Sequence, residues 1–299
     1  MPNPWPAASY GDWSETCDTL HAHTQVLGKL AATTAPPEPE FLQAALRLTA
    51  RGWETAPLPA PDDSGAFVLA LDLHSHEAIA EHSDGRSRRV ALTPHRSVGE
   101  VTREVLGAVG DLVGSIDFDP SPDEVHWSVR LDQDEEHSRY EPAEVSSYFG
   151  AAIRASQVLA AFRAPYRGRS TPVNAWWGSF DLAVSLFSGP RDEPPGGDST
   201  VEMAFGWWPG DPRYPKAAFY SYARPAAAGF EQGEINPAAA RWHDELGEYI
   251  LDWDEVRAGE DPQGMALDFA RSAFRHARES GGWDEALAAD AEGRPPPEG

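Results

Sequence analysis

The longest apolar run of the chain, residues 171–189, constrains the fold most, because its pattern predicts a strand near the centre of the protein. Side chains alternate between the two faces of a strand. One face would carry Phe180, Leu182, Val184 and Leu186, which suits a hydrophobic core. The other face would carry Trp177, Ser179, Asp181, Ala183 and Ser185. Small and polar groups beside a tryptophan predict the wall of a pocket, with an edge strand as the alternative.

Around this strand, apolar spacing predicts helices and antiparallel strands. Helices are expected at 13–30 with Asp12 as N-cap, and at 97–113, 142–162, 266–278 and 284–289. Further strands are expected at 41–54, 66–73, 76–82, 88–92, 125–131, 201–208 and 217–223, and residues 246–253 form a short apolar stretch. Runs of strands beside helices favour an α+β fold, with antiparallel sheets packed against several helices. We expect one compact domain over 1–290, with sub-lobes 13–120 and 121–290 of similar element order, and a disordered tail at 291–299.

Composition argues against several partners and cofactors. The formal net charge of −24 disfavours nucleic acid and anionic membranes, which select for basic surfaces. One cysteine, Cys17, permits neither an internal disulfide nor a Cys-rich zinc site. No stretch resembles a signal peptide or a bilayer span, so we expect a cytoplasmic protein. The sequence has no glycine-rich dinucleotide motif, P-loop or Gly-x-Ser-x-Gly elbow, so we expect no cofactor.

Two residues are the candidate catalytic groups. His21 lies on a predicted helix beside a buried stripe, and Asp18, one turn earlier, is placed to orient its imidazole as a general base. Asp181 lies inside a strand, where aspartate is disfavoured, which is typical of a functional site. Its possible roles are general base, amine anchor or metal ligand. The structural alternatives are a histidine that bridges two elements and an aspartate that accepts backbone N–H groups.

Further residues are candidates for substrate binding. Arg51 and Lys29 would hold an anionic group, although a structural ion pair explains Arg51 equally well. Aromatic residues would shape the pocket or hold a cation, or else simply form core. The complete set of predicted binding residues is Arg51, Lys29, Gln25, Ser179, Trp177, Trp208, Tyr220, Tyr222, His137 and Tyr140.

A metal site is the weaker alternative. His74 and His76 would share one face of a predicted strand, a spacing that chelates a metal when a third ligand arrives. Such a site would need three ligands to converge from among His21, His74, His76, His137, Glu40 and Asp181.

Several short motifs together resemble an uncharacterised bacterial family, domain of unknown function 5996, over nearly the whole chain. They are Thr-Leu-His at 19–21, Thr-Gln at 24–25, Gly-Lys at 28–29, Thr-Ala-Arg-Gly at 49–52, Ser-Asp-Gly at 83–85, Trp-Gly-Ser-Phe-Asp-Leu-Ala at 177–183, Phe-Ser-Gly at 187–189, Trp-Pro-Gly at 208–210, Ala-Phe-Tyr-Ser-Tyr-Ala at 218–223 and Gly-Trp-Asp at 282–284. The resemblance implies a single unit but supplies no activity. It also implies a divergent member, because histidine is usual in the family at Asn174 and Thr200, and common at Glu40 and Gln43.

The leading functional hypothesis is an enzyme without a nucleotide cofactor that acts on a small amine- or acid-bearing metabolite. Its acid–base chemistry would be an elimination or a ring closure in specialised metabolism. The second hypothesis is a binding protein, within a homo- or hetero-oligomer, that uses exposed tryptophans around Trp5 and at 207–208 as the contact surface. The third is a metal-dependent enzyme with a histidine and acid site.

Overall fold

The computed structural model describes residues 5–189, 201–284 and 287. Two antiparallel sheets packed with helices make up the protein, which confirms the predicted α+β class. The first sheet has the order β1-β2-β4-β5-β6, with β3 paired to β4: β1 (Arg47–Leu48), β2 (Gly52–Glu54), β3 (Leu58–Pro59), β4 (Ala66–Asp72), β5 (Glu77–His82) and β6 (Ser87–Ala91). The second has the order β11-β12-β10-β9-β8-β7: β7 (Asn174–Trp176), β8 (Asp181–Phe187), β9 (Glu202–Trp208), β10 (Ala218–Arg224), β11 (Arg241–His243) and β12 (Glu248–Asp252).

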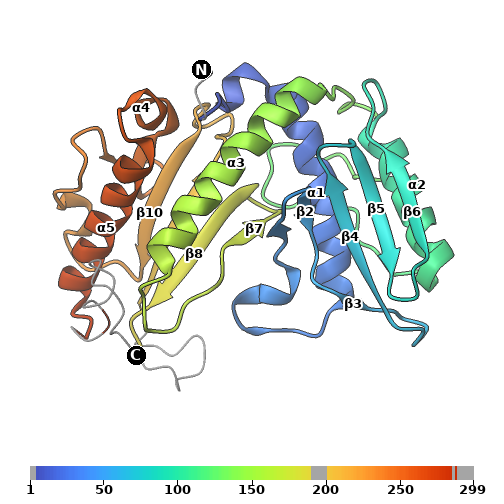
Figure 1. The fold of residues 1–299 in the computed structure, drawn as a ribbon, viewed down its shortest axis with the longest axis horizontal. Coiled ribbons are helices and arrows are strands. Elements are labelled where there is room, and N and C mark those ends of the chain that lie inside the picture. The colour runs from blue at the N-terminus through green and yellow to red at the C-terminus, as the bar shows by residue number, and fades with distance from the viewer. Residues whose placement is uncertain (1–4, 190–200, 285–286, 288–299) are drawn as a thin grey trace.

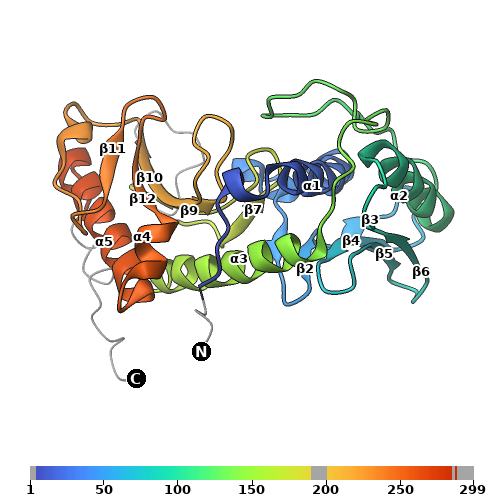
Figure 2. The ribbon, with the colours of Figure 1, turned by 90° about the horizontal axis from the view of Figure 1, so that it is seen from above.

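The helices lie on opposite sides of the strands. They are α1 (Ser14–Thr34), α2 (Val98–Val113), α3 (Pro142–Arg163), α4 (Trp253–Ala258) and α5 (Pro262–Gly281), with short 3-10 turns at Tyr10–Asp12, Pro39–Ala44 and Phe230–Gln232. Figure 2 shows α1 and α2 on one side and α3 on the other. Helix α3 packs on β8 and β9, and α5 packs beside it on β9, β10 and β12 (Figure 1). Among the described residues, no helix combines the length and the apolar character that a bilayer span requires.

A short backbone bridge joins the two sheets. Leu46 and Ala175 exchange two N–H···O bonds of 3.0 and 2.9 Å, which places β1 beside β7. One hydrophobic core includes side chains from both sheets and from α1, α2, α3 and α5. The described part of the chain is therefore held together by a shared core as well as by this bridge.

The central apolar stretch is a hairpin rather than one strand. The chain reverses between β7 and β8, where Phe180 has a φ of 58°, and the two strands pair so that Trp176 faces Asp181. The alternation predicted for β8 is confirmed: Leu182, Val184 and Leu186 face α3, while Asp181 and Ala183 face the other side. Trp177 lies in the turn, so it is not on the Asp181 face as predicted.

Three other local predictions are wrong for reasons of tertiary context. Residues 41–54 form a 3-10 turn and the short strands β1 and β2, because the chain turns back at Gly52. Residues 125–131 form no strand, since they have no strand partner and lie in a loop beside α1. Asp12 belongs to a 3-10 turn, and Trp13 occupies the N-cap of α1 without a side-chain cap. The predicted helix at 284–289 and the tail at 291–299 fall largely outside the described residues, as does the loop at 190–199.

Candidate functional site

The face of the second sheet that turns away from α3 forms the floor of a cavity. Strand pairing aligns Ala183 with Gly206, and Gly206 with Tyr220, all on this face. The small side chains leave room above the sheet, and the cavity there has a volume of about 700 Å³. Its described lining residues are Tyr10, Cys17, Asp18, His21, Glu124, Val125, His126, Trp127, Ser179, Phe180, Asp181, Trp208, Gly210, Asp211, Pro212, Arg213, Tyr220, Tyr222, Arg224, Leu246 and Glu248.

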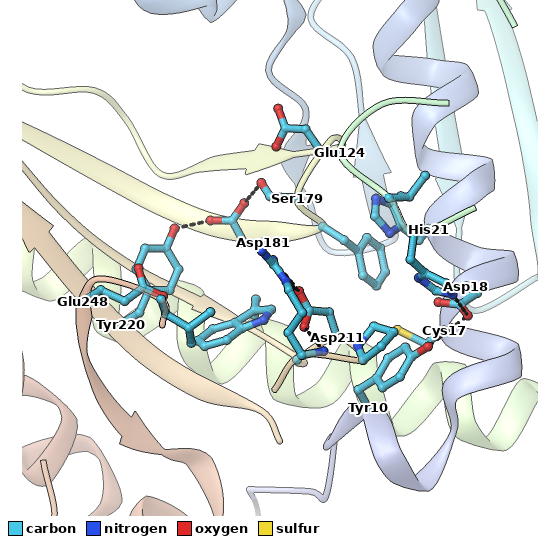
Figure 3. Close-up of a pocket in the computed structure, with 18 of the residues that line it drawn as sticks. Tyr10, Cys17, Asp18, His21, Glu124, Ser179, Asp181, Asp211, Tyr220 and Glu248 are labelled. Carbon is cyan, nitrogen blue, oxygen red and sulfur yellow. Dashed lines mark hydrogen bonds and ion pairs between the residues drawn. The ribbon is translucent and has the colours of Figure 1, made fainter. Parts of the chain in front are cut away.

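Asp181 is the most enclosed carboxyl group of the cavity, with 4% of its surface exposed. The hydroxyls of Ser179 and Tyr220 donate to its two oxygens, one to each (Figure 3). Burial raises the pKa of Asp181 to about 6, while these two hydrogen bonds oppose the shift and the nearby Glu124 charge adds to it. A carboxyl group with this pKa exchanges protons near neutral pH, which suits a general acid or base.

Gly206 allows Tyr220 to reach Asp181. A Cβ atom at position 206 would lie 2.3 Å from the Cζ and hydroxyl oxygen of Tyr220. The tyrosine ring therefore lies flat over β9, with its hydroxyl directed at β8. Trp208 supports the ring edge-on, with 5.6 Å between ring centroids. The glycine in this strand marks a close approach of a side chain to the backbone.

We expect Gly206→Ala and Tyr220→Phe to raise the pKa of Asp181 above about 6, because each removes a hydrogen bond that stabilises the carboxylate. The measurement is a carbon-13 NMR titration of the Asp181 carboxyl group. Tyr222→Phe is the matched control, since the Tyr222 hydroxyl makes no hydrogen bond to Asp181 among the described residues. An unchanged pKa in Gly206→Ala would contradict the role given to the glycine.

Glu248 is a second cavity carboxyl group, and the sequence analysis missed it. It begins β12, half-buried, across from His243 in the β11–β12 pairing. Burial first, and then the Asp181 charge, raise the pKa of Glu248 to about 7, while Arg224 and Arg213 oppose the shift. Among the described residues, the Glu248 carboxyl group has no hydrogen-bond partner. An acid next to the apolar residues 249–251 is the signal that could have found it, by the argument that selected Asp181.

His21 lies on the opposite wall, on α1, and has a structural role there. Its Nε2 is 2.8 Å from the carbonyl oxygen of Trp177 and 3.0 Å from that of Gly178, so Nε2–H donates to the β7–β8 turn. The ring stacks on Phe180 at 4.8 Å. Burial lowers the pKa of His21 to about 4, although the two carbonyls oppose the shift, so the imidazole is neutral at pH 7. Its Nδ1 has no partner among the described residues and remains an acceptor on the cavity wall.

Asp18, one turn before His21, does not orient the imidazole as predicted. It accepts a hydrogen bond of 3.0 Å from the Tyr10 hydroxyl, and His126 Nε2 lies 3.7 Å away. Burial is the main cause of its raised pKa. Figure 3 shows Asp18 and Tyr10 on one side of the cavity, with Tyr220 and Glu248 on the other.

The two arginines that line the cavity are engaged. Arg213 donates to Asp211 through Nε at 3.0 Å and through a terminal nitrogen at 2.6 Å. The guanidinium of Arg224 lies 4.5 Å from the ring centre of Tyr222, a cation–π contact. Neither is the predicted Arg51, which pairs with Glu54 and Glu81 in the first sheet, at 3.0 and 3.2 Å.

Gln25 and Lys29 hold the loop that forms one cavity wall. The Gln25 side chain exchanges bonds of 2.8 and 2.9 Å with the backbone of Asp123, and Lys29 pairs with the Asp123 carboxylate. The Lys29 ammonium also lies over the ring of Trp177, whose Nε1–H donates to Ala44. None of these side chains lines the cavity. They fix the loop from which Glu124 and residues 125–127 face inward.

His137 and Tyr140 lie behind the same wall. Burial opposes a charge on His137, but its hydrogen bond of 2.7 Å to the fully buried Asp134 and that residue's charge raise its pKa. The Tyr140 hydroxyl contacts His76 Nδ1 at 3.1 Å.

Of the predicted site residues, the structure brings six to one cavity: His21, Asp181, Ser179, Trp208, Tyr220 and Tyr222.

The histidines expected for a metal site do not converge. His74 and His76 lie in the turn before β5 rather than along a strand, and His76 has a φ of 55°. Within the described ranges, no three His, Cys, Asp or Glu side chains are grouped to hold a metal ion.

The comparison of the whole chain with protein families agrees with the motifs. The Family of unknown function (DUF5996) matches residues 5–290, so the chain belongs to this family. No curated protein and no solved structure gives a match. Three of the positions at which the resemblance implies histidine lie outside the cavity lining: Glu40 pairs with Arg169, Asn174 accepts from Arg47, and Gln43 accepts from the backbone N–H of residue 38. Thr200 lies outside the described residues.

Proposed function

We propose that this member of a family of unknown function is an enzyme that binds a small amine-bearing metabolite in the cavity and transfers protons through Asp181. One observation carries the proposal: Asp181 and Glu248, with pKa values raised to about 6 and about 7, share one aromatic-lined cavity. Two carboxyl groups with shifted pKa values in one pocket are typical of acid–base sites.

The charge of the lining favours an amine over an acid as the bound group. The described lining has five carboxyl groups, and its two arginines are engaged by Asp211 and by the Tyr222 ring. Trp208, Tyr220 and Tyr222 add aromatic surface, which attracts cations. An ammonium group would be attracted electrostatically, whereas an anion would need an arginine to leave its partner.

An elimination or a ring closure fits these groups without a nucleotide cofactor. In an elimination, the Asp181 carboxylate takes a proton from substrate carbon, the electron pair forms the double bond, and the leaving group departs with a proton from Glu248. In a ring closure, the same base takes a proton from a substrate ammonium group, the lone pair of the resulting amine attacks an electrophilic carbon of the same molecule, and the group displaced from that carbon departs with a proton from Glu248. Ser179 and Tyr220 orient the carboxylate in both cases.

The location of the tryptophans supports an enzyme over a partner-binding protein. Trp5, Trp207 and Trp208 are 6%, 0% and 8% exposed, so they do not form the exposed surface that the binding hypothesis needs. Trp208 lines the cavity instead. A concave aromatic site is typical of small-molecule binding.

The test is turnover of an amine-bearing metabolite library by the purified protein, followed by mass spectrometry for lost leaving groups or cyclised isomers. We expect Asp181→Asn to slow the reaction by about 100-fold or more, because it removes the base. The wild-type rate should fall as the pH drops below about 6, where Asp181 becomes protonated. Ser185→Ala is the matched control, since Ser185 follows on β8 but does not line the cavity. An Asp181→Asn variant with the wild-type rate would refute the proposal, and amine binding without turnover would favour a binding protein.

A further inference from the structure

We propose that the cavity binds a linear molecule with two ammonium groups, one held by Asp181 and Glu248 and the other by Asp18. This inference rests on the proposed function and specifies its substrate class. The two acidic ends come from different elements: Asp181 and Glu248 lie on the second sheet, and Asp18 lies on α1. Figure 3 shows them on opposite sides of the same cavity.

Among the described residues, no lysine or arginine forms an ion pair with the carboxyl groups at either end, although the charges of Arg224 and Arg213 act on Glu248. Asp181 accepts only from the neutral hydroxyls of Ser179 and Tyr220, and Glu248 has no hydrogen-bond partner among the described residues. At the other end, Asp18 has 13% of its side chain exposed and accepts from the Tyr10 hydroxyl, with His126 at 3.7 Å. Enclosed carboxylates without a lysine or arginine as ion-pair partner are unfavourable, and a cation at each end would relieve both.

Part of the cavity wall suits an apolar spacer. Cys17, Phe180, Val125 and Trp127 line the same cavity, and they come from α1, the β7–β8 turn and the loop fixed by Asp123. His21 lies in this wall, 9% exposed, with an unbonded Nδ1 that can accept a hydrogen bond from the ligand. A chain of methylene groups would lie against the apolar wall while its ends contact the carboxylates.

The experiment is isothermal titration of the full-length protein at pH 7.5 with α,ω-diaminoalkanes of increasing length, each compared with the n-alkylamine of the same length. We expect one diamine length to bind at least about tenfold more tightly than its alkylamine, because the second ammonium gains a charge-assisted bond. Asp18→Asn should remove this advantage and leave alkylamine affinity unchanged. The exposed Asp111→Asn, on α2, carries the same change of net charge and should alter neither affinity.

The outcomes separate the inference from the proposed function. Alkylamine binding with no diamine advantage at any length overturns the inference and leaves the proposed function intact. Failure of both series to bind overturns the inference and the amine class in the proposed function. The comparison of diamine and alkylamine affinities for the wild-type protein tests the inference even if Asp18→Asn does not fold. Equal weakening of diamine and alkylamine by a folded Asp18→Asn also overturns the inference.

Discussion

Replacing Gly28 by alanine is expected to lower the free energy of unfolding by about 3 kcal/mol, although alanine is normally the better helix residue. A Cβ atom at this position of α1 would lie 1.9 Å from the ring of Trp177. That ring is 7% exposed and is held by its hydrogen bond to Ala44 and by the Lys29 ammonium. It therefore has no space to move away, and the contact must be relieved by displacing α1 or the β7–β8 turn.

Urea unfolding of Gly28→Ala measures this effect. Gly107→Ala in α2 is the matched control, because no atom lies within 4 Å of the Cβ that it would add. The control should stabilise the protein by up to about 1 kcal/mol, as expected for an open helix position. If both variants were stabilised, the close packing of Trp177 on α1 would be refuted.

Asp181→Asn is expected to stabilise the protein at pH 8 by about 3 kcal/mol, while it removes the proposed base. The folded-state pKa of about 6 lies above the ordinary 3.8, so the folded protein binds more protons than the unfolded chain between these values. Stability therefore falls as the pH rises through this window, and the full cost is present above about 6. Asparagine has no charge to bury, and its oxygen can still accept from Tyr220.

Chemical denaturation at pH 4, 6 and 8 tests this sign. The advantage of Asp181→Asn should be full at pH 8 and mostly lost at pH 4, where wild-type Asp181 is protonated in the folded protein and about half protonated in the unfolded chain. Asp72→Asn should change the stability in the opposite direction. Burial opposes the ionisation of Asp72, but hydrogen bonds from the backbone N–H groups of Ser75 and His74 outweigh burial and lower the pKa of Asp72. Its loss should destabilise the protein at pH 8. A pH-independent difference for Asp181→Asn would contradict the burial cost.

Part of the site follows directly from local sequence. The alternation along β8 places Asp181 opposite the core side chains, and an acid inside a strand marks it as unusual. The same argument applied to Glu248 would have found the second carboxyl group. The i, i+3 spacing of Asp18 and His21 places both on one face of α1, and both do line the cavity. The predicted contact between them is wrong. Asp18 accepts a hydrogen bond from Tyr10 instead, and His21 donates to the carbonyls of residues 177 and 178.

The assignment of the other polar residues required the tertiary structure. Lys29 and Gln25 have the chemistry of ligand-binding side chains, but the loop at Asp123 occupies both. Arg51 pairs with Glu54 on β2 and with Glu81 on β5, while Arg213 and Arg224 line the cavity. Nothing in the local pattern distinguishes an arginine that meets an acid of its own chain from one that meets a ligand.

The sequence by itself determined the secondary structure with strong periodicity, the two faces of β8, the α+β class and the family. These depend on interactions between residues a few positions apart, which the order of residues fixes directly. The tertiary structure alone decided that 171–189 forms a hairpin, that 125–131 has no strand partner, and that Asp18, Asp181 and Glu248 share one cavity. Each depends on contacts between segments many residues apart, and their register is set by packing of the whole chain rather than by local spacing.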